Sequence, residues 1–129
     1  MTPLKQAEQV YKTIQSWLGD GCQPVAMEQA QRRADICIQC PHNSKRKIEE
    51  VFKGAAIAPI RKMIEAKTKM SLHVKDEERL HICAICDCVL SLKVFIPIEH
   101  IVDTTSAETL NDFPSYCFVK TETKEEKYQ

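Results

Sequence analysis

Hydrophobic residues return every three to four positions through the first twenty residues. This spacing predicts one amphipathic helix with a single apolar face. Thr2 can cap this helix, Pro3 suits its first position, and Gly19 with Gly21 ends it. The apolar stripe consists of Leu4, Ala7, Val10, Tyr11, Ile14, Trp17 and Leu18. We therefore expect a long helix that packs along one side.

Two further helical patterns follow Pro24. The first has its apolar positions at Met27, Ala30, Ala34 and Cys37, and it turns Gln31, Arg32 and Asp35 to solvent. The second covers residues 44–69 after Ser44, and Pro59, with Gly54 upstream, is expected to bend or split it. Its stripe consists of Ile48, Val51, Phe52, Ala55, Ala56, Ile60, Met63 and Ile64.

The pattern changes after residue 80. Residues 89–98 are apolar and rich in β-branched side chains, which predicts a short hairpin or strand. Residues 113–119 predict one last strand or an anchoring turn within a polar, acidic stretch. Residues 120–129 have no apolar pattern and are expected to form a mobile acidic tail.

Composition and net charge narrow the class of protein. The 129 residues suffice for one domain, and the 6% aromatic content predicts a thin, mainly aliphatic core. Eighteen basic and eighteen acidic side chains give zero net charge, which argues against a dedicated nucleic-acid coat protein. No apolar run approaches the ~20 residues of a membrane span, and the first residues lack the pattern of a secretory signal. The chain is expected to be soluble and cytoplasmic.

Seven cysteines are the most unusual feature of the composition. An odd number of cysteines in a chain expected to be intracellular argues against a disulfide framework and favours metal binding. Cys37 with Cys40, and Cys83 with Cys86, form two Cys-x-x-Cys pairs. Two such pairs supply the four soft thiolates that suit a structural Zn²⁺ ion. Zinc knuckles often have glycine where Asp87 stands, because the backbone there is left-handed.

The other cysteines leave several arrangements open. The metal could take four of six thiols that include Cys88 and Cys117, or a second ion could use these two with His81 or His100. Cys88 and Cys117 could equally be small buried core residues. Cys22 stands alone and is expected to be structural or a free thiol. An iron–sulfur cluster also takes four thiolates, but the tighter cysteine runs typical of such clusters are missing.

These elements predict the fold class and the domain organisation. We expect a mainly helical α+β fold in which a three-helix scaffold carries the zinc-knuckle pair and a small β-hairpin. Residues 1–119 would form a single domain, with residues 44–70 as a helical insertion between the cysteine pairs. The metal would replace part of the missing core.

No catalytic constellation is present in the sequence. The four histidines are scattered, only three glycines occur, and a four-thiolate zinc site has no open coordination position for chemistry. We therefore expect a protein that is not an enzyme.

Charge is unevenly distributed along the chain. Residues 44–70 carry eight basic and three acidic side chains, and residues 99–129 carry three basic and seven acidic ones. Both segments could simply be solvated faces. Alternatively, the basic segment could dock an acidic protein or a phosphate backbone through Lys45, Arg46, Lys47, Lys53, Arg61 and Lys62.

The most specific motifs are Cys37-x-x-Cys40-Pro41-x-Asn43, Cys83-x-x-Cys86-x-Cys88 and Pro114-x-x-Cys117. With them, residues 11–118 resemble small cysteine-rich, zinc-ribbon-like proteins encoded in tailed-phage and prophage genomes. Asp87 and Phe118 depart from this pattern, which often has glycine and tryptophan there. The resemblance implies a phage-encoded zinc protein, but it implies no activity. Because Cys88 and Cys117 stand at recurring positions of the pattern, it also favours them as metal ligands.

Together these features favour a structural zinc protein that acts as a binding adaptor for a host or phage macromolecule. The partner is expected to be a protein, with nucleic acid possible through residues 44–70 and no membrane partner. The alternative is a structural component of the virion or of its assembly. The sequence does not predict an oligomeric state.

Overall fold

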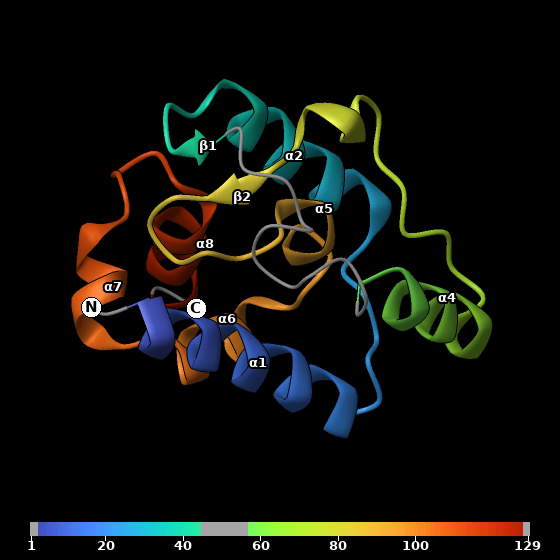
Figure 1. Ribbon diagram of the computed structural model, residues 1–129. Helices are drawn as coiled ribbons and strands as arrows, with labels where there is room; N and C mark the ends of the chain where they lie inside the picture. The colour runs from blue at the N-terminus through green and yellow to red at the C-terminus, as the bar shows by residue number, and fades with distance from the viewer. Residues whose placement is uncertain (1–2, 45–56, 128–129) are drawn as a thin grey trace.

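Helices make up most of the described chain, which comprises residues 3–44 and 57–127 of a computed structural model (Figure 1). The mainly helical fold with a small antiparallel sheet is as predicted, although short helices are added to the expected scaffold. The helices are α1 (Pro3–Gly19), α2 (Met27–Gln39), α4 (Ile57–Thr68), α5 (Leu90–Lys93), α6 (Ile98–Thr104), α7 (Ala107–Asp112) and α8 (Phe118–Lys127). A 3₁₀ turn, η1 (Glu77–Arg79), and the strands β1 (Asn43–Ser44) and β2 (Ile82–Cys83) complete the described elements.

Helix α1 lies against α6 along one edge of the molecule (Figure 1). The predicted stripe is buried at Val10, Ile14 and Trp17, whereas Tyr11 is 61% exposed and does not belong to it. The helix ends as the glycines predict, because the Cys22 amide, with its left-handed backbone (φ 51°), donates to the Trp17 carbonyl at 2.9 Å. This closure buries the Cys22 side chain at the helix end, so Cys22 has a structural place.

Helix α2 buries Ala30, Ala34 and Cys37 as predicted, while Met27 at its start is exposed. Its least expected residue is Arg33, which is only 1% exposed. The Arg33 guanidinium donates to both carboxylate oxygens of Glu122 in α8, at 2.8 and 2.6 Å. It also donates to the carbonyl oxygens of Val94 and Ile96, at 3.1 and 2.7 Å. Arg33 therefore ties α2 to α8 and to the chain after α5.

Asn43 and Ser44 form β1 and pair with β2, and the start of the helix predicted after Ser44 lies outside the described residues. Helix α4 begins at Ile57, which places Pro59 in its first turn, where a missing amide costs nothing. Ile64 is buried, whereas Met63 is 49% exposed. Most of the predicted stripe lies outside the described residues, namely Ile48, Val51, Phe52, Ala55 and Ala56.

The hairpin or strand predicted over residues 89–98 is wrong. Leu90–Lys93 form α5, Ile98 opens α6, and every side chain of residues 91–96 is buried. A continuous apolar run buried on all sides cannot be assigned to strand or helix by periodicity, and tertiary packing overrides the β-branched preference here. The strands instead lie beside the two cysteine pairs, with Asn43 opposite Cys83.

The last predicted strand is replaced by a turn and helix α8. The Cys117 amide donates to the Pro114 carbonyl at 3.0 Å, which agrees with the alternative of an anchoring turn, and Phe113, Phe118 and Val119 are buried around it. Residues 120–127 continue α8, although they have no apolar pattern. The Arg33–Glu122 pair supplies the anchor that the pattern lacks.

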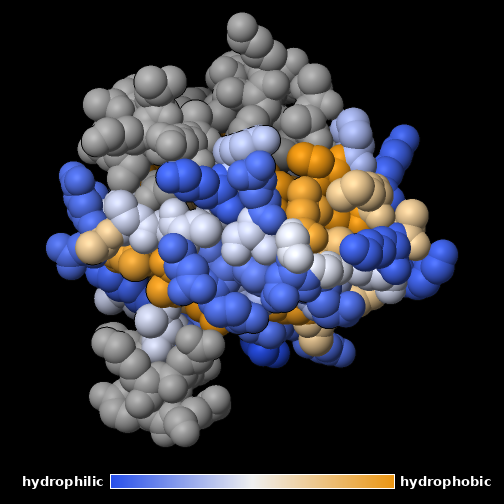
Figure 2. Space-filling view, turned by 90° about the horizontal axis from the view of Figure 1, so that it is seen from below, coloured by the Kyte–Doolittle hydropathy of each residue, from blue (hydrophilic) through white to orange (hydrophobic). Residues whose placement is uncertain are grey.

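Figure 2 views the molecule from below the view of Figure 1 and shows a mainly hydrophilic face, with one larger apolar area at the upper right and smaller apolar spots elsewhere. Across the described ranges, no helix combines the length and the apolar character that crossing a membrane requires.

Candidate metal centre

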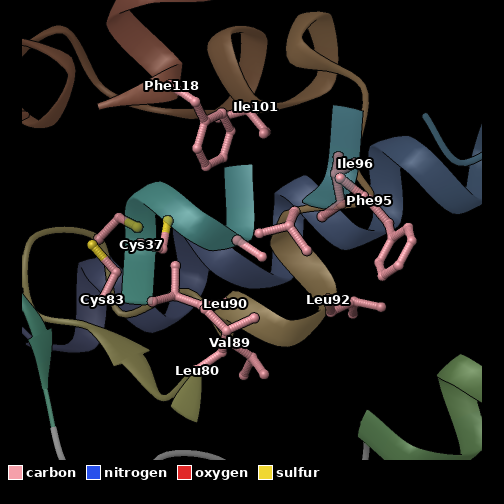
Figure 3. Packing of buried hydrophobic residues seen from close by; sticks show 14 of the residues in the cluster. Cys37, Leu80, Cys83, Val89, Leu90, Leu92, Phe95, Ile96, Ile101 and Phe118 are labelled. Atoms are coloured by element: carbon pink, nitrogen blue, oxygen red, sulfur yellow. The ribbon is translucent and has the colours of Figure 1, made fainter. Parts of the chain in front are cut away.

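Three separate parts of the chain bring cysteines to one place. Cys37 lies in the last turn of α2 and Cys40 caps this helix, while Cys83 belongs to β2 and Cys117 precedes α8. Figure 3 shows Cys37 next to Cys83 in the buried cluster. The Cys37 thiol interacts electrostatically with Cys40, Cys83 and Cys117. Residues up to 80 positions apart in the sequence are thus neighbours in the fold.

Backbone hydrogen bonds hold the two Cys-x-x-Cys turns against each other. The Ala84 amide donates to the His42 carbonyl at 2.8 Å, next to the pairing of Asn43 with Cys83. In the first turn the His42 amide points at the Cys40 sulfur, at 3.4 Å. In the second turn the Asp87 amide donates to the Cys83 carbonyl, and Asp87 has the left-handed backbone expected of a zinc knuckle, with φ 59°. Both turns therefore have backbones that suit thiolate ligands.

A small cavity of about 20 Å³ lies between these segments. Its sulfur-bearing lining comes from Cys37, Cys40, Cys83 and Cys117. Its remaining lining includes His42, Asn43, Ile85, Leu90, Lys93, Phe113, Pro114 and Phe118. A cavity of this size holds about one water-sized particle.

Cys86 and Cys88 occupy a different position from the other four thiols. Cys86 is 2% exposed, accepts a hydrogen bond from the Cys83 thiol and donates one to Cys88. Cys88 lines another small cavity, of about 10 Å³, together with Val10 and Ile14 of α1. Cys86, which the sequence assigns to the first-choice quartet, is therefore not part of the four-thiol lining.

Lys93 lies within the sulfur cluster. The sequence alone assigned it no role at the candidate site. It is 2% exposed, and its Nζ donates to the Cys86 sulfur at 3.2 Å. Nζ also lies over the rings of Phe113 and Phe118, at 4.6 and 5.6 Å from their centroids. The only signal available in the sequence was a single lysine inside an apolar run.

Burial would lower the pKa of Lys93, but the surrounding Cys86, Cys88, Cys83 and Cys117 raise it well above its usual value. Attraction of this kind comes from thiolates, so it favours the ammonium form of Lys93 once the surrounding sulfurs have lost their protons.

The thiols themselves favour the protonated form in the ion-free chain. Burial raises the pKa of Cys37 to about 12 and that of Cys86 to about 12, and it also raises the pKa of Cys117. The hydrogen bond to Cys86, followed by burial, raises the pKa of Cys83, whereas the hydrogen bond from Cys86 lowers the pKa of Cys88. All seven cysteines are free thiols.

The ion-free arrangement is not a finished coordination sphere. Among the described residues, no group of three or more His, Cys, Asp or Glu side chains already stands in position to hold an ion. One of the four lining thiols, that of Cys83, is engaged in a hydrogen bond to Cys86. Binding an ion would require the short cysteine side chains to turn into the cavity and lose their protons.

Tyr116 covers the outer side of the cluster. Its hydroxyl lies 3.3 Å from the Cys40 sulfur, and this hydrogen bond raises the pKa of Tyr116 to about 12. The ring is 45% exposed and borders an open surface hollow of about 490 Å³ with Ile36, Gln39 and Pro41. From the sequence, Tyr116 is expected only within the last strand or anchoring turn over residues 113–119, and not beside the cysteines.

The structure brings neither histidine proposed for a second ion into the four-thiol lining. The His100 ring is hydrogen-bonded to Ser16 of α1 and to Asp20 in the turn after it, at 2.8 and 3.2 Å, and so links this part of the chain to α6. His81 is partly buried, and its backbone amide donates to Asn43 Oδ1 at 2.9 Å.

Most of the predicted basic docking surface lies outside the described residues, namely Lys45, Arg46, Lys47 and Lys53. The other two residues are on α4, where Lys62 is exposed and Arg61 lies 3.6 Å from a Glu77 carboxylate oxygen. The described part of this surface is therefore one exposed lysine and one arginine that has an acidic neighbour.

Comparison of the chain with protein-family models, with curated proteins and with solved structures finds no match.

Proposed function

We propose that this chain is a structural zinc protein that acts as a binding adaptor for another macromolecule, a protein by preference. The observation that carries the proposal is the gathering of six free thiols from three distant parts of the chain around the buried side chain of Lys93. Reduced thiols in this number suit Zn²⁺, which prefers sulfur ligands in closed structural sites.

The residues present fit a single ion better than a cluster of several. The four-thiol cavity measures about 20 Å³. One ion with its ligands turned inward needs little more room than one water molecule, whereas an iron–sulfur cluster adds several iron and sulfide atoms. When bound, zinc would cross-link α2, β2 and the turn before α8. The proposed role of the zinc ion is this cross-link alone.

The adaptor part of the proposal rests on the charge of residues 44–70 and on the resemblance to phage-encoded zinc-ribbon-like proteins. A metal-stiffened core would present this basic segment to an acidic surface. Binding of that kind depends on charge and weakens as salt rises.

Metal analysis of chain purified under reducing conditions tests the zinc assignment. We expect zinc in stoichiometric amount, lost on chelation together with folded structure. Stoichiometric iron with sulfide, or a compact reduced chain free of metal, would contradict it.

Affinity capture with charge-reversed variants tests the adaptor assignment. The pair Lys47→Glu and Lys62→Glu should release a captured acidic protein. The matched pair Lys12→Glu and Lys75→Glu changes the net charge equally outside residues 44–70 and should retain it. Equal retention by both pairs refutes the basic surface. Gel shifts on DNA and RNA that fall steeply with salt would identify the partner as nucleic acid instead.

A further inference from the structure

The four-thiol cavity separates the six clustered cysteines into two groups. Cys37, Cys40, Cys83 and Cys117 line it, and they come from α2, β2 and the turn before α8. The pairing of Asn43 with Cys83 holds the two Cys-x-x-Cys turns against each other. The Pro114–Cys117 turn supplies the fourth thiol, that of Cys117. A four-coordinate ion at this point would have a sulfur from each surrounding segment.

Cys86 does not line this cavity, although it is hydrogen-bonded to two residues that do, Cys83 and Lys93. Lys93 Nζ donates to the Cys86 sulfur at 3.2 Å, and Phe113 and Phe118 fix the ammonium group from the other side. Cys88 points to the separate cavity beside Val10 and Ile14. The regular spacing of the second Cys-x-x-Cys pair therefore does not decide which sulfurs surround the cavity.

We propose that one Zn²⁺ ion is held in this cavity by Cys37, Cys40, Cys83 and Cys117, and that Cys86 instead remains hydrogen-bonded to Lys93. This inference rests on the proposed zinc function and names the ligands of that site. Each ligating thiol gives its proton to solvent as its sulfur bonds the ion, so four protons leave for one ion bound.

The charge of the site supports this division. Four thiolates on a divalent cation leave two negative charges in a buried place, which is costly without a nearby cation. Lys93 is placed to provide that cation without being a ligand, because its buried side chain lines the same cavity as the four thiols. Its bond to Cys86 holds it within the cluster.

Replacing zinc with cadmium identifies which cysteines bind the metal ion in the wild-type chain. After zinc is replaced by ¹¹³Cd, scalar couplings from the metal reach the β-protons of bonded cysteines only. We expect couplings to Cys37, Cys40, Cys83 and Cys117, and none to Cys86 or Cys88. A coupling to Cys86 would overturn the proposed set while leaving the zinc function intact. Two cadmium signals per chain would overturn the single ion.

Two matched substitutions give a second readout. Cys117→Ser should weaken zinc binding by more than about 100-fold and remove one sulfur band from the spectrum of the cobalt-substituted chain. Cys86→Ser should keep the four-sulfur spectrum and weaken zinc binding by less than about 100-fold, as expected for a group outside the coordination sphere. The reverse ranking refutes the ligand set. A wild-type chain without stoichiometric metal refutes the proposed function itself.

Discussion

Two regions of the molecule differ in how they are held together: the contact between α1 and α6, and the sulfur cluster. Helix α1 has 17 residues and buries Val10, Ile14 and Trp17, so its position follows from apolar burial along a long helix. Around the sulfurs the elements are two strands of two residues each and the four-residue α5. Elements this short do not persist alone. One region is therefore positioned by a long apolar helix face, and for the other we predict that cross-links add to the stability supplied by burial.

The largest expected effect is that of removing zinc, which should unfold the sulfur cluster and spare α1 and α6 to a greater extent. Structural zinc contributes about 10–16 kcal/mol of apparent folding free energy in small zinc peptides. Hydrogen exchange after chelation under reducing buffer should show loss of amide protection at residues 37–44 and 82–94 first. Cys22→Ala, a substitution outside the cluster, should keep its metal and its protection pattern. Simultaneous loss of amide protection in the sulfur cluster and in α1 and α6 would show that the two regions do not differ in how they are stabilised.

Arg33→Met is expected to have the next largest effect. It removes the buried partner of Glu122 and leaves the carbonyl oxygens of Val94 and Ile96 without their donor. Breaking a buried ion pair costs about 3–5 kcal/mol. Urea denaturation should show this loss, with zinc content unchanged because the thiols are not touched.

Arg32→Met is the matched control for this substitution, because Arg32 is exposed on the same helix. It should change the free energy of unfolding by at most about 0.5 kcal/mol. Equal effects of the two substitutions would mean that the Arg33–Glu122 pair does not join α2 to α8 energetically.

The smallest expected effect is at Asp87, whose backbone is left-handed at φ 59°. Alanine there bears the full strain of about 1–2 kcal/mol, whereas glycine avoids it. Asp87→Ala should therefore be less stable than Asp87→Gly by about 1 kcal/mol and should bind zinc more weakly. Asp76 has the same φ in a surface turn. The same two substitutions there should reproduce the stability difference without changing zinc affinity.

Prediction from sequence succeeded where local pattern and burial agree. The end of α1 and the apolar face of α2 followed from periodicity, capping glycines and alanines at helical spacing. It failed over residues 89–98, because a run buried on all sides has no polar face to reveal its period. It made no prediction for the burial of Arg33, since the partner that makes burial of a charged residue favourable is distant in the sequence.

For the candidate site, the motifs identified the cysteines and the left-handed position at Asp87, but not their grouping. Zinc itself stays a prediction. Spacing favoured Cys86 as a ligand because Cys-x-x-Cys pairs commonly share a metal ion. Lys93, Tyr116 and Cys117 lie 53 to 80 positions away from the first cysteine pair in the sequence, yet they border the same cluster. No local pattern encodes such distances.

The amino-acid sequence alone determined which residue types are available: thiols in excess, few aromatic rings, and helices long enough to be recognised by their period. The tertiary structure alone decided which four thiols surround one cavity and that an ammonium group is buried beside a fifth. The physical reason is that helical period and capping are set by neighbours in the chain. The surroundings of a buried charge are set by whichever distant segments pack against it.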